Sequence, residues 1–434
     1  MIGIVADDIT GANDIGIMYA KAGFRTYVYP IDATPLVGGN MPLPDVLVMN
    51  TNSRLDSRAE AYCKVFRMTT ALYSLGCNRF FNKTCSVFRG NVGAECDAML
   101  DALGEDFGVI ILGFPKNGRT TLDGVHYVHG KRLEDSEFRN DPANPMLESD
   151  LVSILQAQTK RKVDLVSIDI VEQGADALRA EINRKRERCS YLILDVRDDR
   201  SLHIIAEAVK NERVLCGSSA LSEHMSLLPE LSKGINFSLK AERPVPGTNV
   251  LCAAGSLMPQ TAAQIAYAKQ QGMISYELDS IKLLDEREKL RHLADVTAAV
   301  GGSLKEGHDV LIHTSGDRDK VEETKRQGSL LGLSNTEVSR LISNALAWAV
   351  KEIVDRTNNR KLLIAGGETS AAVCDKLGIE GIQVLREIEP GLPSCRSLGS
   401  VPIDLVLKSG SFGSEAFFLK AVRHLKQLHE HQTL

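Results

Sequence analysis

Short, continuous apolar runs alternate with longer amphipathic segments along the whole chain, and this alternation constrains the fold more than any other feature. The first run, Ile2–Ala6, contains no polar side chain, which is typical of a strand buried on both faces of a parallel sheet. Apolar residues then recur at helical spacing at Ala12, Ile15 and Met18. Repeated units of this kind predict an α/β fold with mostly parallel sheets.

Further strands and helices are expected where the same pattern recurs. Strands are predicted at residues 25–29, 46–49, 79–82, 109–112, 163–168, 191–196, 214–216, 250–254, 309–314, 361–365 and 405–408. Helices are predicted at 58–75, from Pro259 onward, from a capping box at Ser334 to about Arg356, and at 420–431. The last of these helices is expected to be amphipathic and solvated.

Residues 241–248 predict a linker, because they hold two prolines and a glycine without an apolar period. The pattern restarts after them, so we expect two α/β domains, 1–243 and 248–434. The length of 434 residues agrees with two or three domains of roughly 150 residues each. Ligands of such sheets bind beyond the carboxyl ends of the strands, and site residues are therefore sought there.

Composition argues against several classes of protein. With 56 acidic and 51 basic residues the net charge is −5, and aromatic residues make up only 5%, so a nucleic-acid partner is not expected. No apolar run approaches the roughly 18 residues of a membrane span. There is no secretory leader pattern, and the nine cysteines have irregular spacing. We therefore expect a cytoplasmic protein with reduced thiols.

Two adjacent carboxylates, Asp7 and Asp8, follow the first predicted strand and precede a helix. Carboxylates in this place can accept a proton from a hydroxyl group or hold Mg²⁺. The alternative is that one of them only caps the helix, as Asp commonly does. The pair followed by the turn at Gly11 favours a functional role, while the ligands of any metal stay unassigned.

A second group of polar residues follows the strand predicted at 79–82. Lys83 and Arg89 flank the expected start of a helix near Gly90, a position that suits an anionic group. In the second half, four apolar strands run into glycine turns at residues 255–256, 315–316, 366–369 and 408–413. Several such turns in one domain favour a nucleotide site, because glycine lets backbone amides approach phosphate oxygens. Neither a Walker nor a Rossmann glycine motif is present.

Taken together, these blocks resemble the four-carbon acid sugar kinase family along essentially the whole chain. The blocks that carry the resemblance are residues 6–14, 50–54, 88–95, 118–121, 255–256, 366–370, 390–393 and 408–413. Asn13-Asp14 and the block at 50–54 are most similar to the D-threonate kinase branch. The resemblance implies an N-terminal domain that binds a sugar acid, a C-terminal domain that binds ATP, and an active site in the inter-domain cleft.

The resemblance also implies residue roles. The sugar-acid site would contain Asp8, Arg54, Lys83, Thr84, Cys85 and Ser86, and the nucleotide site would contain Ser256, Gly366, Gly367, Glu368, Thr369 and Gly410. The family usually has Lys, one variable residue and then Asp-Ser-Thr in the second motif. In this chain Cys85 and Val87 replace a carboxylate and a hydroxyl, which bears on the choice of substrate.

The reaction expected from these features is ATP-dependent phosphorylation of the terminal hydroxyl of a threonate- or erythronate-type acid, with Mg²⁺ bridging phosphate oxygens. Arg54 and Lys83 would hold the carboxylate. Asp8 would accept the proton, and Asp7 would support it or contact Mg²⁺. A non-catalytic sugar-acid sensor and a metal-dependent aldolase or isomerase remain as alternatives, and a homodimer is compatible with the sequence.

Overall fold

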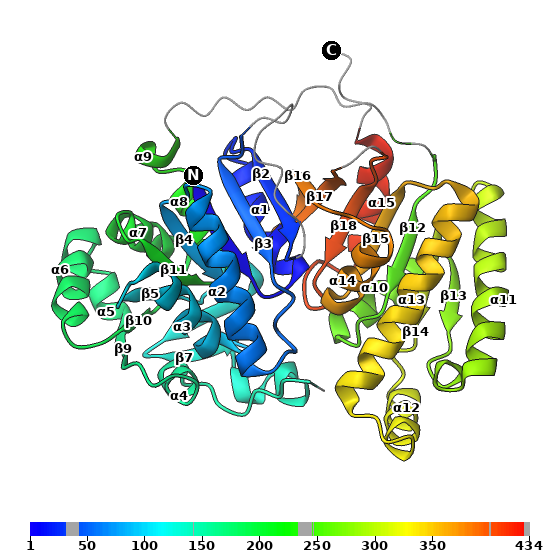
Figure 1. Ribbon diagram of the computed structural model, residues 1–434, viewed down its shortest axis with the longest axis horizontal. Coiled ribbons are helices and arrows are strands. Elements are labelled where there is room, and N and C mark those ends of the chain that lie inside the picture. Colours follow the sequence, from blue (N-terminus) through cyan, green and yellow to red (C-terminus); the bar gives the residue numbers. More distant parts are fainter. Residues whose placement is uncertain (32–42, 142, 233–244, 246, 399–400, 429–434) are drawn as a thin grey trace, which may run out of the picture. The chain divides into compact units, whose positions relative to one another are not determined.

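The computed structural model describes residues 1–31, 43–141, 143–232, 245, 247–398 and 401–428. It divides into two compact units, Met1–Phe237 and Ser238–Leu434, which are blue to green and green to red in Figure 1. Most of the linker predicted at 241–248 lies outside the described residues.

The first unit is built on a parallel sheet whose strand order is β2-β3-β1-β4-β11-β5-β10-β9. The strands are β1 Ile2–Ala6, β2 Thr26–Pro30, β3 Val46–Asn50, β4 Arg79–Lys83, β5 Gly108–Ile111, β9 Val163–Val166, β10 Tyr191–Leu194 and β11 Val214–Gly217. The helices are α1 Ile9–Ala20, α2 Arg58–Ser74, α3 Val92–Leu103, α4 Leu151–Gln156, α5 Ile168–Val171, α6 Ala175–Arg186, α7 Asp199–Val209, α8 Ala220–Ser226 and α9 Pro229–Ser232. A small antiparallel sheet contains β6 Arg119–Leu122, β7 Val125–Val128 and β8 Lys131–Arg132.

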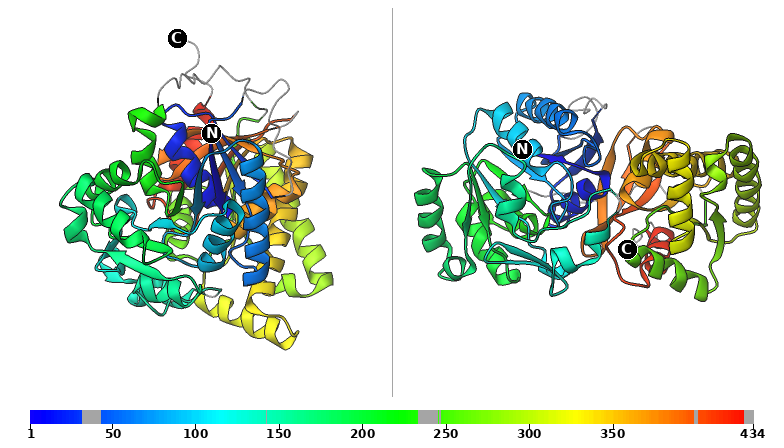
Figure 2. Two further views of the ribbon diagram at one scale, coloured as in Figure 1. Left: turned by 60° about the vertical axis from the view of Figure 1, so that its left-hand side comes forward. Right: turned by 90° about the horizontal axis from the view of Figure 1, so that it is seen from below.

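Strand β1 lies between β3 and β4, and this order determines where polar side chains gather. The chain adds β2 and β3 on one side of β1 and then crosses to β4 on the other side. Helices α1 and α2 both pack on β1, and helices cover the two faces of the sheet (Figure 2). Because every residue of β1 is buried, a ligand cannot reach the strand itself. Polar residues that follow β1 can contact a ligand beyond its carboxyl end. Such a reversal of strand order is the usual ligand position in open α/β sheets.

The second unit has the strand order β13-β14-β12-β15-β18-β17-β16. Its strands are β12 Leu251–Ala254, β13 Ile274–Leu278, β14 Val310–Thr314, β15 Lys361–Ala365, β16 Ile382–Glu389, β17 Leu392–Ser397 and β18 Asp404–Lys408. Its helices are α10 Pro259–Gln270, α11 Glu286–Lys305, α12 Arg318–Leu330, α13 Asn335–Thr357, α14 Gly367–Lys376 and α15 Phe417–Gln427. The first five strands in this order are parallel, whereas β17 runs antiparallel to both β16 and β18. The α/β class with mostly parallel sheets is therefore confirmed.

Three of the predicted elements differ from the structure by more than one residue. The strand expected at 163–168 ends at Val166, and α5 begins at Ile168. The strand expected at 191–196 ends at Leu194. The helix predicted at 420–431 begins earlier, at Phe417, and its apolar face, including Phe417, Phe418 and Leu425, is buried. It is therefore solvated on one face only, because aromatic residues before its expected start pack into the core; residues 429–431 lie outside the described residues. Within the described residues, no helix is both long enough and apolar enough to cross a membrane.

Gly217 at the end of β11 offers a test of this packing. Its φ is +137°, and a β-carbon would lie 1.8 Å from the carbonyl oxygen of Ile111 on β5. Gly174 also has a positive φ, +107°, but nothing lies within 4 Å of a β-carbon there. Both changes to alanine strain the backbone, so their difference isolates the collision. We expect Gly217→Ala to lower the free energy of unfolding by about 1–3 kcal/mol more than Gly174→Ala in urea titrations. Equal losses would show that the contact between β5 and β11 relaxes without cost.

Candidate functional site

In the first unit, polar side chains converge where β3, β1 and β4 end. Asp7 and Asp8 follow β1, Arg54 follows β3, and Lys83 is the last residue of β4. The Asp7 amide donates to the Lys83 carbonyl at 3.3 Å, and the Arg54 amide donates to the Asp7 carbonyl at 3.3 Å. The parallel ladder thus continues past the strand ends and brings three distant parts of the sequence together.

Arg54 binds both carboxylates. Its Nε and Nη2 donate to the two oxygens of Asp7 at 2.7 and 2.8 Å, and its Nη1 donates to Oδ2 of Asp8 at 2.5 Å. The Asp7 and Asp8 side chains are only 1% and 7% exposed, so their charges need this partner. Burial opposes the charge on Arg54, but Asp7 and Asp8 raise its pKa well above the usual value. These bonds use three of the five N–H groups of the guanidinium.

Asp8 also caps helix α1. Its Oδ1 accepts from the Gly11 amide at 2.6 Å, and its Oδ2 accepts from the Thr10 hydroxyl at 3.0 Å. The capping role considered from the sequence is therefore present, alongside the bond to Arg54. Burial alone would raise the pKa of Asp8, but the charges of Arg54 and Lys83 lower it overall. Asp8 is accordingly held as a carboxylate.

Asp14 belongs to the same cluster, although no role was predicted for it. Its Oδ2 lies 3.3 Å from Nζ of Lys83 and accepts from the Ser219 hydroxyl at 2.6 Å. Its Oδ1 is buried and has no hydrogen-bond partner among the described residues. Burial raises the pKa of Asp14, and Lys83 and Ser219 offset this only in part. Asp14 lies six residues after Asp8 on α1, and Ser219 is 205 positions further along the chain. Nothing local in the sequence indicates the pair.

Cys85 lies beside two arginines. Nε of Arg89 is 3.3 Å from its sulfur, and Nη1 of Arg89 donates to Asp141 at 2.5 Å. Burial would raise the pKa of the Cys85 thiol, but the positive charges of Arg89 and Arg54 lower it overall. Cys85 therefore faces the cationic side of the cluster. Thr84 and Ser86 are buried next to it, and the Thr84 hydroxyl donates to the Cys85 carbonyl at 3.4 Å.

A fourth carboxylate, Glu95 on α3, completes the group and was also missed. Its Oε1 accepts from the Ser53 hydroxyl at 2.6 Å, and Ser53 lies 2.8 Å from the Thr51 hydroxyl. Burial, together with the negative charge of Asp7, raises the pKa of Glu95 to about 8. Near neutral pH this side chain therefore stays largely protonated.

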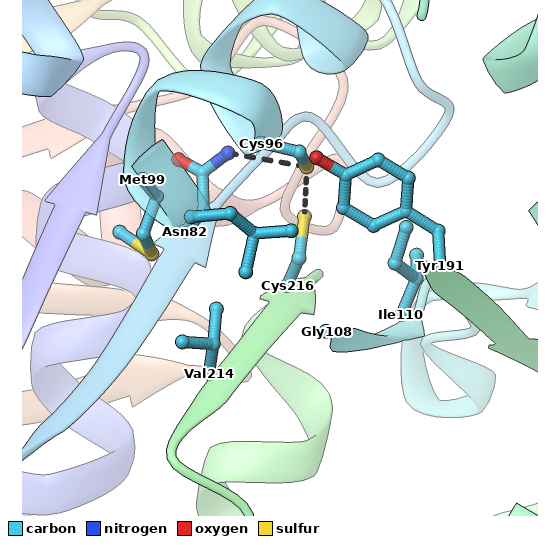
Figure 3. Close-up of a pocket in the computed structure, with 9 residues that line it drawn as sticks. Asn82, Cys96, Met99, Gly108, Ile110, Tyr191, Val214 and Cys216 are labelled. Carbon is cyan, nitrogen blue, oxygen red and sulfur yellow. Dashed lines mark hydrogen bonds between the residues drawn. The ribbon is translucent and has the colours of Figure 1, made fainter. Parts of the chain in front are cut away.

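A small cavity lies beside β4 in the same unit (Figure 3). Its volume is about 10 Å³, which leaves room for about one water molecule. Cys96 and Cys216 face each other at its edge with their sulfurs 3.1 Å apart, and Nδ2 of Asn82 is 3.6 Å from the Cys96 sulfur. Burial raises the pKa of Cys216 well above its usual value. The cavity is a packing feature and is too small for a metabolite.

In the second unit, the predicted nucleotide residues gather beyond β12, β15 and β18. The Gly255 amide donates to the Ala365 carbonyl at 3.1 Å, and the Gly366 amide donates to the Lys408 carbonyl at 2.8 Å. The three turns therefore leave the sheet at the same level. Gly367 begins helix α14, and the fourth glycine turn, at 315–316, follows β14 on the other side of β12.

The turns approach one another so closely that side chains are excluded. A β-carbon at Gly410 would lie 2.2 Å from Oγ of Ser256, and one at Gly255 would lie 2.3 Å from Oγ1 of Thr369. Gly366 has a φ of +119°. Glu368 contacts α13 instead, where its Oε2 accepts from the Ser339 hydroxyl at 2.6 Å. Backbone amides and small hydroxyls beside a helix start fit the phosphates of a nucleotide.

The described residues offer magnesium no protein cage, since no group of three His, Cys, Asp or Glu side chains is arranged there so that it could hold a metal ion. Mg²⁺ commonly binds through substrate phosphates with one or two carboxylates. Both oxygens of Asp7 are bonded to Arg54, which favours a supporting role for Asp7 over metal ligation. Magnesium carried by nucleotide phosphates fits this arrangement.

Two family models match the chain. A sugar-binding N-terminal domain matches residues 2–225, and a nucleotide-binding C-terminal domain matches residues 251–418. The chain belongs to the four-carbon acid sugar kinase family. The resemblance seen in the sequence is thereby confirmed at the family level.

Curated relatives cover the chain almost completely. A 3-oxo-tetronate kinase of Burkholderia multivorans is 33% identical over 98% of this chain and 97% of its own length. One of Brucella melitensis is 30% identical over 98% and 96%. Among solved structures, one from Salmonella typhimurium LT2 has a TM-score of 0.78 at 27% identity, covering 98% of this chain and 99% of its own. Another, from Haemophilus influenzae, has a TM-score of 0.69 at 30% identity, covering 96% and 98%. The assignment to a D-threonate branch stays a prediction.

Glu95 allows the electrostatics of the first unit to be tested. Its pKa is about 8 in the folded chain against an ordinary 4.5, so between these values the folded state keeps a proton that the unfolded state loses. The free energy of unfolding should therefore fall as pH rises through this window. Glu95→Gln keeps an acceptor for Ser53 and cannot ionise. Relative to wild type, we expect it to be near neutral at pH 5 and to gain roughly 2–4 kcal/mol at pH 8 in urea titrations. The same difference at both pH values would contradict a protonated Glu95.

Proposed function

We propose that this protein uses ATP to phosphorylate the terminal hydroxyl of a four-carbon sugar acid. The observation that carries the proposal is the full-length similarity to 3-oxo-tetronate kinases, at 30–33% identity for several relatives. We take 3-oxo-tetronates as the first substrates to test, followed by threonate and erythronate. Free cysteines throughout the described residues agree with a reaction in the reducing cytoplasm.

The first unit would bind the acid. Arg54 keeps two N–H groups beyond those given to Asp7 and Asp8, and Lys83 adds a second cation beside them. Together they would hold the substrate carboxylate and direct the distal hydroxyl toward the carboxylates. Asp7 would fix the orientation of Arg54 through its two bonds. Phosphoryl transfer depends mainly on such positioning and on neutralising charge.

Asp8 is the proposed proton acceptor. It is ionised, and its position is set by the helix cap and by Arg54, so it would orient the hydroxyl without itself moving. Asp14 competes for this role, because its raised pKa and its buried Oδ1 are properties of a proton carrier. Mutating each carboxylate in turn can show which of the two accepts the proton.

The second unit would bind ATP through Ser256, the start of α14 at residues 366–369, and Gly410. Magnesium bound to the phosphates would neutralise charge that develops during transfer. Cys85 would help to select the acid, because it lies where the family usually has a carboxylate and here contacts Arg89. The Cys85 sulfur already accepts from Arg89, so a substrate hydroxyl would lose the strong carboxylate acceptor that the family usually offers at this position.

A coupled assay of ADP release should detect turnover with a 3-oxo-tetronate, threonate or erythronate. Neutral four-carbon polyols such as erythritol should give little turnover, because Arg54 and Lys83 would lack a carboxylate partner. We expect at least one acid to exceed erythritol by about 100-fold in kcat/KM. Nucleotide binding without turnover on any acid would favour a sensor instead, and comparable turnover of acid and polyol would remove the proposed role of the cations.

Asp8→Asn and Asp14→Asn should distinguish the proton acceptor. Replacing the acceptor should lower kcat by about 10²–10⁴-fold. With Asp8 as acceptor, Asp8→Asn should show this loss with a much smaller change in the KM of the acid, and Asp14→Asn should change kcat less. The reverse order would assign the proton to Asp14. Folding of both variants would be checked by circular dichroism, since each replaces a buried side chain.

A further inference from the structure

The loop that follows β18 is held by three buried side chains, which we call the carbonyl clamp: Thr261 and Gln264 of α10, and Lys408 at the end of β18. Their exposed fractions are 0%, 1% and 0%. Thr261 and Gln264 lie outside the blocks that carry the family resemblance. Lys408 begins the block at 408–413, but no role was predicted for its side chain. The clamp belongs entirely to the second unit.

The clamp bonds to the main chain of the loop and not to other side-chain charges. Nε2 of Gln264 lies 3.0, 3.0 and 2.9 Å from the carbonyl oxygens of Phe412, Gly413 and Ser414. Nζ of Lys408 donates to the carbonyls of Ser409 at 2.6 Å and Gly410 at 3.2 Å, and the Thr261 hydroxyl donates to that of Gly410 at 2.8 Å. Lys408 also donates to Oγ1 of Thr261 at 3.1 Å, which joins the two side chains.

Turning carbonyls inward turns amides outward. In a trans peptide the N–H of the next residue points opposite to the carbonyl, and the described residues contain no cis peptide bond. The amides that follow these five carbonyls, those of Gly410, Ser411, Gly413, Ser414 and Glu415, therefore point away from the clamp. One of them already binds an anion, because the Ser414 amide donates to Oε2 of Glu389 at 2.7 Å and its hydroxyl donates to Oε1 at 2.6 Å. Successive outward amides form an anion-binding concavity.

Lys408 adds charge to this arrangement. Within the described residues no carboxylate pairs with it as a salt bridge, and all three of its bonds go to neutral oxygens. Burial lowers its pKa to about 7, and the more distant negative charge of Glu389 opposes this only in part. A buried ammonium ion without a direct counter-ion is stabilised by an anion that binds nearby. The loop at Gly410 packs on Ser256, so an anion bound to this loop would lie at the proposed nucleotide site.

We propose that Thr261, Gln264 and Lys408 are positioning residues that hold the 409–414 loop with its amides directed at the phosphates of ATP. This inference rests on the proposed function and adds to it the residues that set phosphate affinity. They act through the backbone, so the clamp should affect ligands in proportion to their phosphate charge and leave the sugar acid unaffected.

Gln264→Leu provides the main test, because it keeps the size of the side chain and removes its donors. We expect the KM for ATP and the inhibition constant of inorganic tripolyphosphate to rise by about 10- to 100-fold. The KM for the acid should stay within about 2-fold and inhibition by adenosine should be unchanged, since neither ligand uses the loop amides. Gln270→Leu is the matched control, because Gln270 is exposed on the same helix, and it should behave as wild type.

Thr261 supplies a second test that tolerates some loss of stability. Thr261→Ser keeps the hydroxyl, and Thr261→Val keeps the shape without it. Weaker ATP and tripolyphosphate binding in Thr261→Val but not in Thr261→Ser would support the clamp even if Gln264→Leu failed to fold. Wild-type phosphate affinity in folded Gln264→Leu and Thr261→Val would overturn it. A wild-type chain that binds no ATP would contradict the proposed function itself, whereas tight binding unaffected by these changes would overturn only the clamp.

Discussion

The first unit depends on one arginine placed between two adjacent buried carboxylates. Two adjacent carboxylates are costly to bury without a cation, because both are desolvated and they repel each other. Arg54 provides three charge-assisted bonds to the pair. It can do so only because β3 is hydrogen-bonded to β1 along its whole length. The strand order of the sheet and the chemistry at its edge are therefore a single constraint.

Much of the fold follows from local pattern. Runs such as Ile2–Ala6 and Lys361–Ala365 were predicted with the bounds that the structure has, because strands buried on both faces leave little freedom in residue type. The strands that were missed are less uniform. Four of the five residues of β13 are intermediate or exposed, and the apolar residues of β16 are interrupted irregularly by Gln383, Arg386 and Glu387. Their pairing depends on neighbours that no local window contains.

The candidate site shows the same division between local and long-range information. Asp8 and Lys83 were predicted from their places after strands and Arg54 from the family resemblance, and the structure brings the three together. Asp14 and Glu95 were not, because both lie inside helices where a carboxylate usually faces solvent. Their role in the cluster becomes visible only when burial, Ser219 and Ser53 are known. Likewise, Gln264 lies in an ordinary helical sequence, and only its three contacts to a loop about 150 residues away distinguish it.

Under the proposed function the two units would bind their anions in different ways, and the difference has a physical consequence. In the first unit the cations are paired in advance with carboxylates, so an incoming acid would have to share Arg54 and Lys83 with Asp7, Asp8 and Asp14. Affinity there depends on a small difference between large charge interactions, and replacing one side chain, such as a carboxylate by Cys85, can change which acid is preferred.

In the second unit the backbone presents the amides, and uncharged side chains together with Lys408 hold them in place. Backbone amides carry no sequence information, so this arrangement can bind the same phosphates while the acid changes. Selectivity for the acid and affinity for the nucleotide can therefore vary independently, because they rest on side-chain charge in one unit and on main-chain geometry in the other.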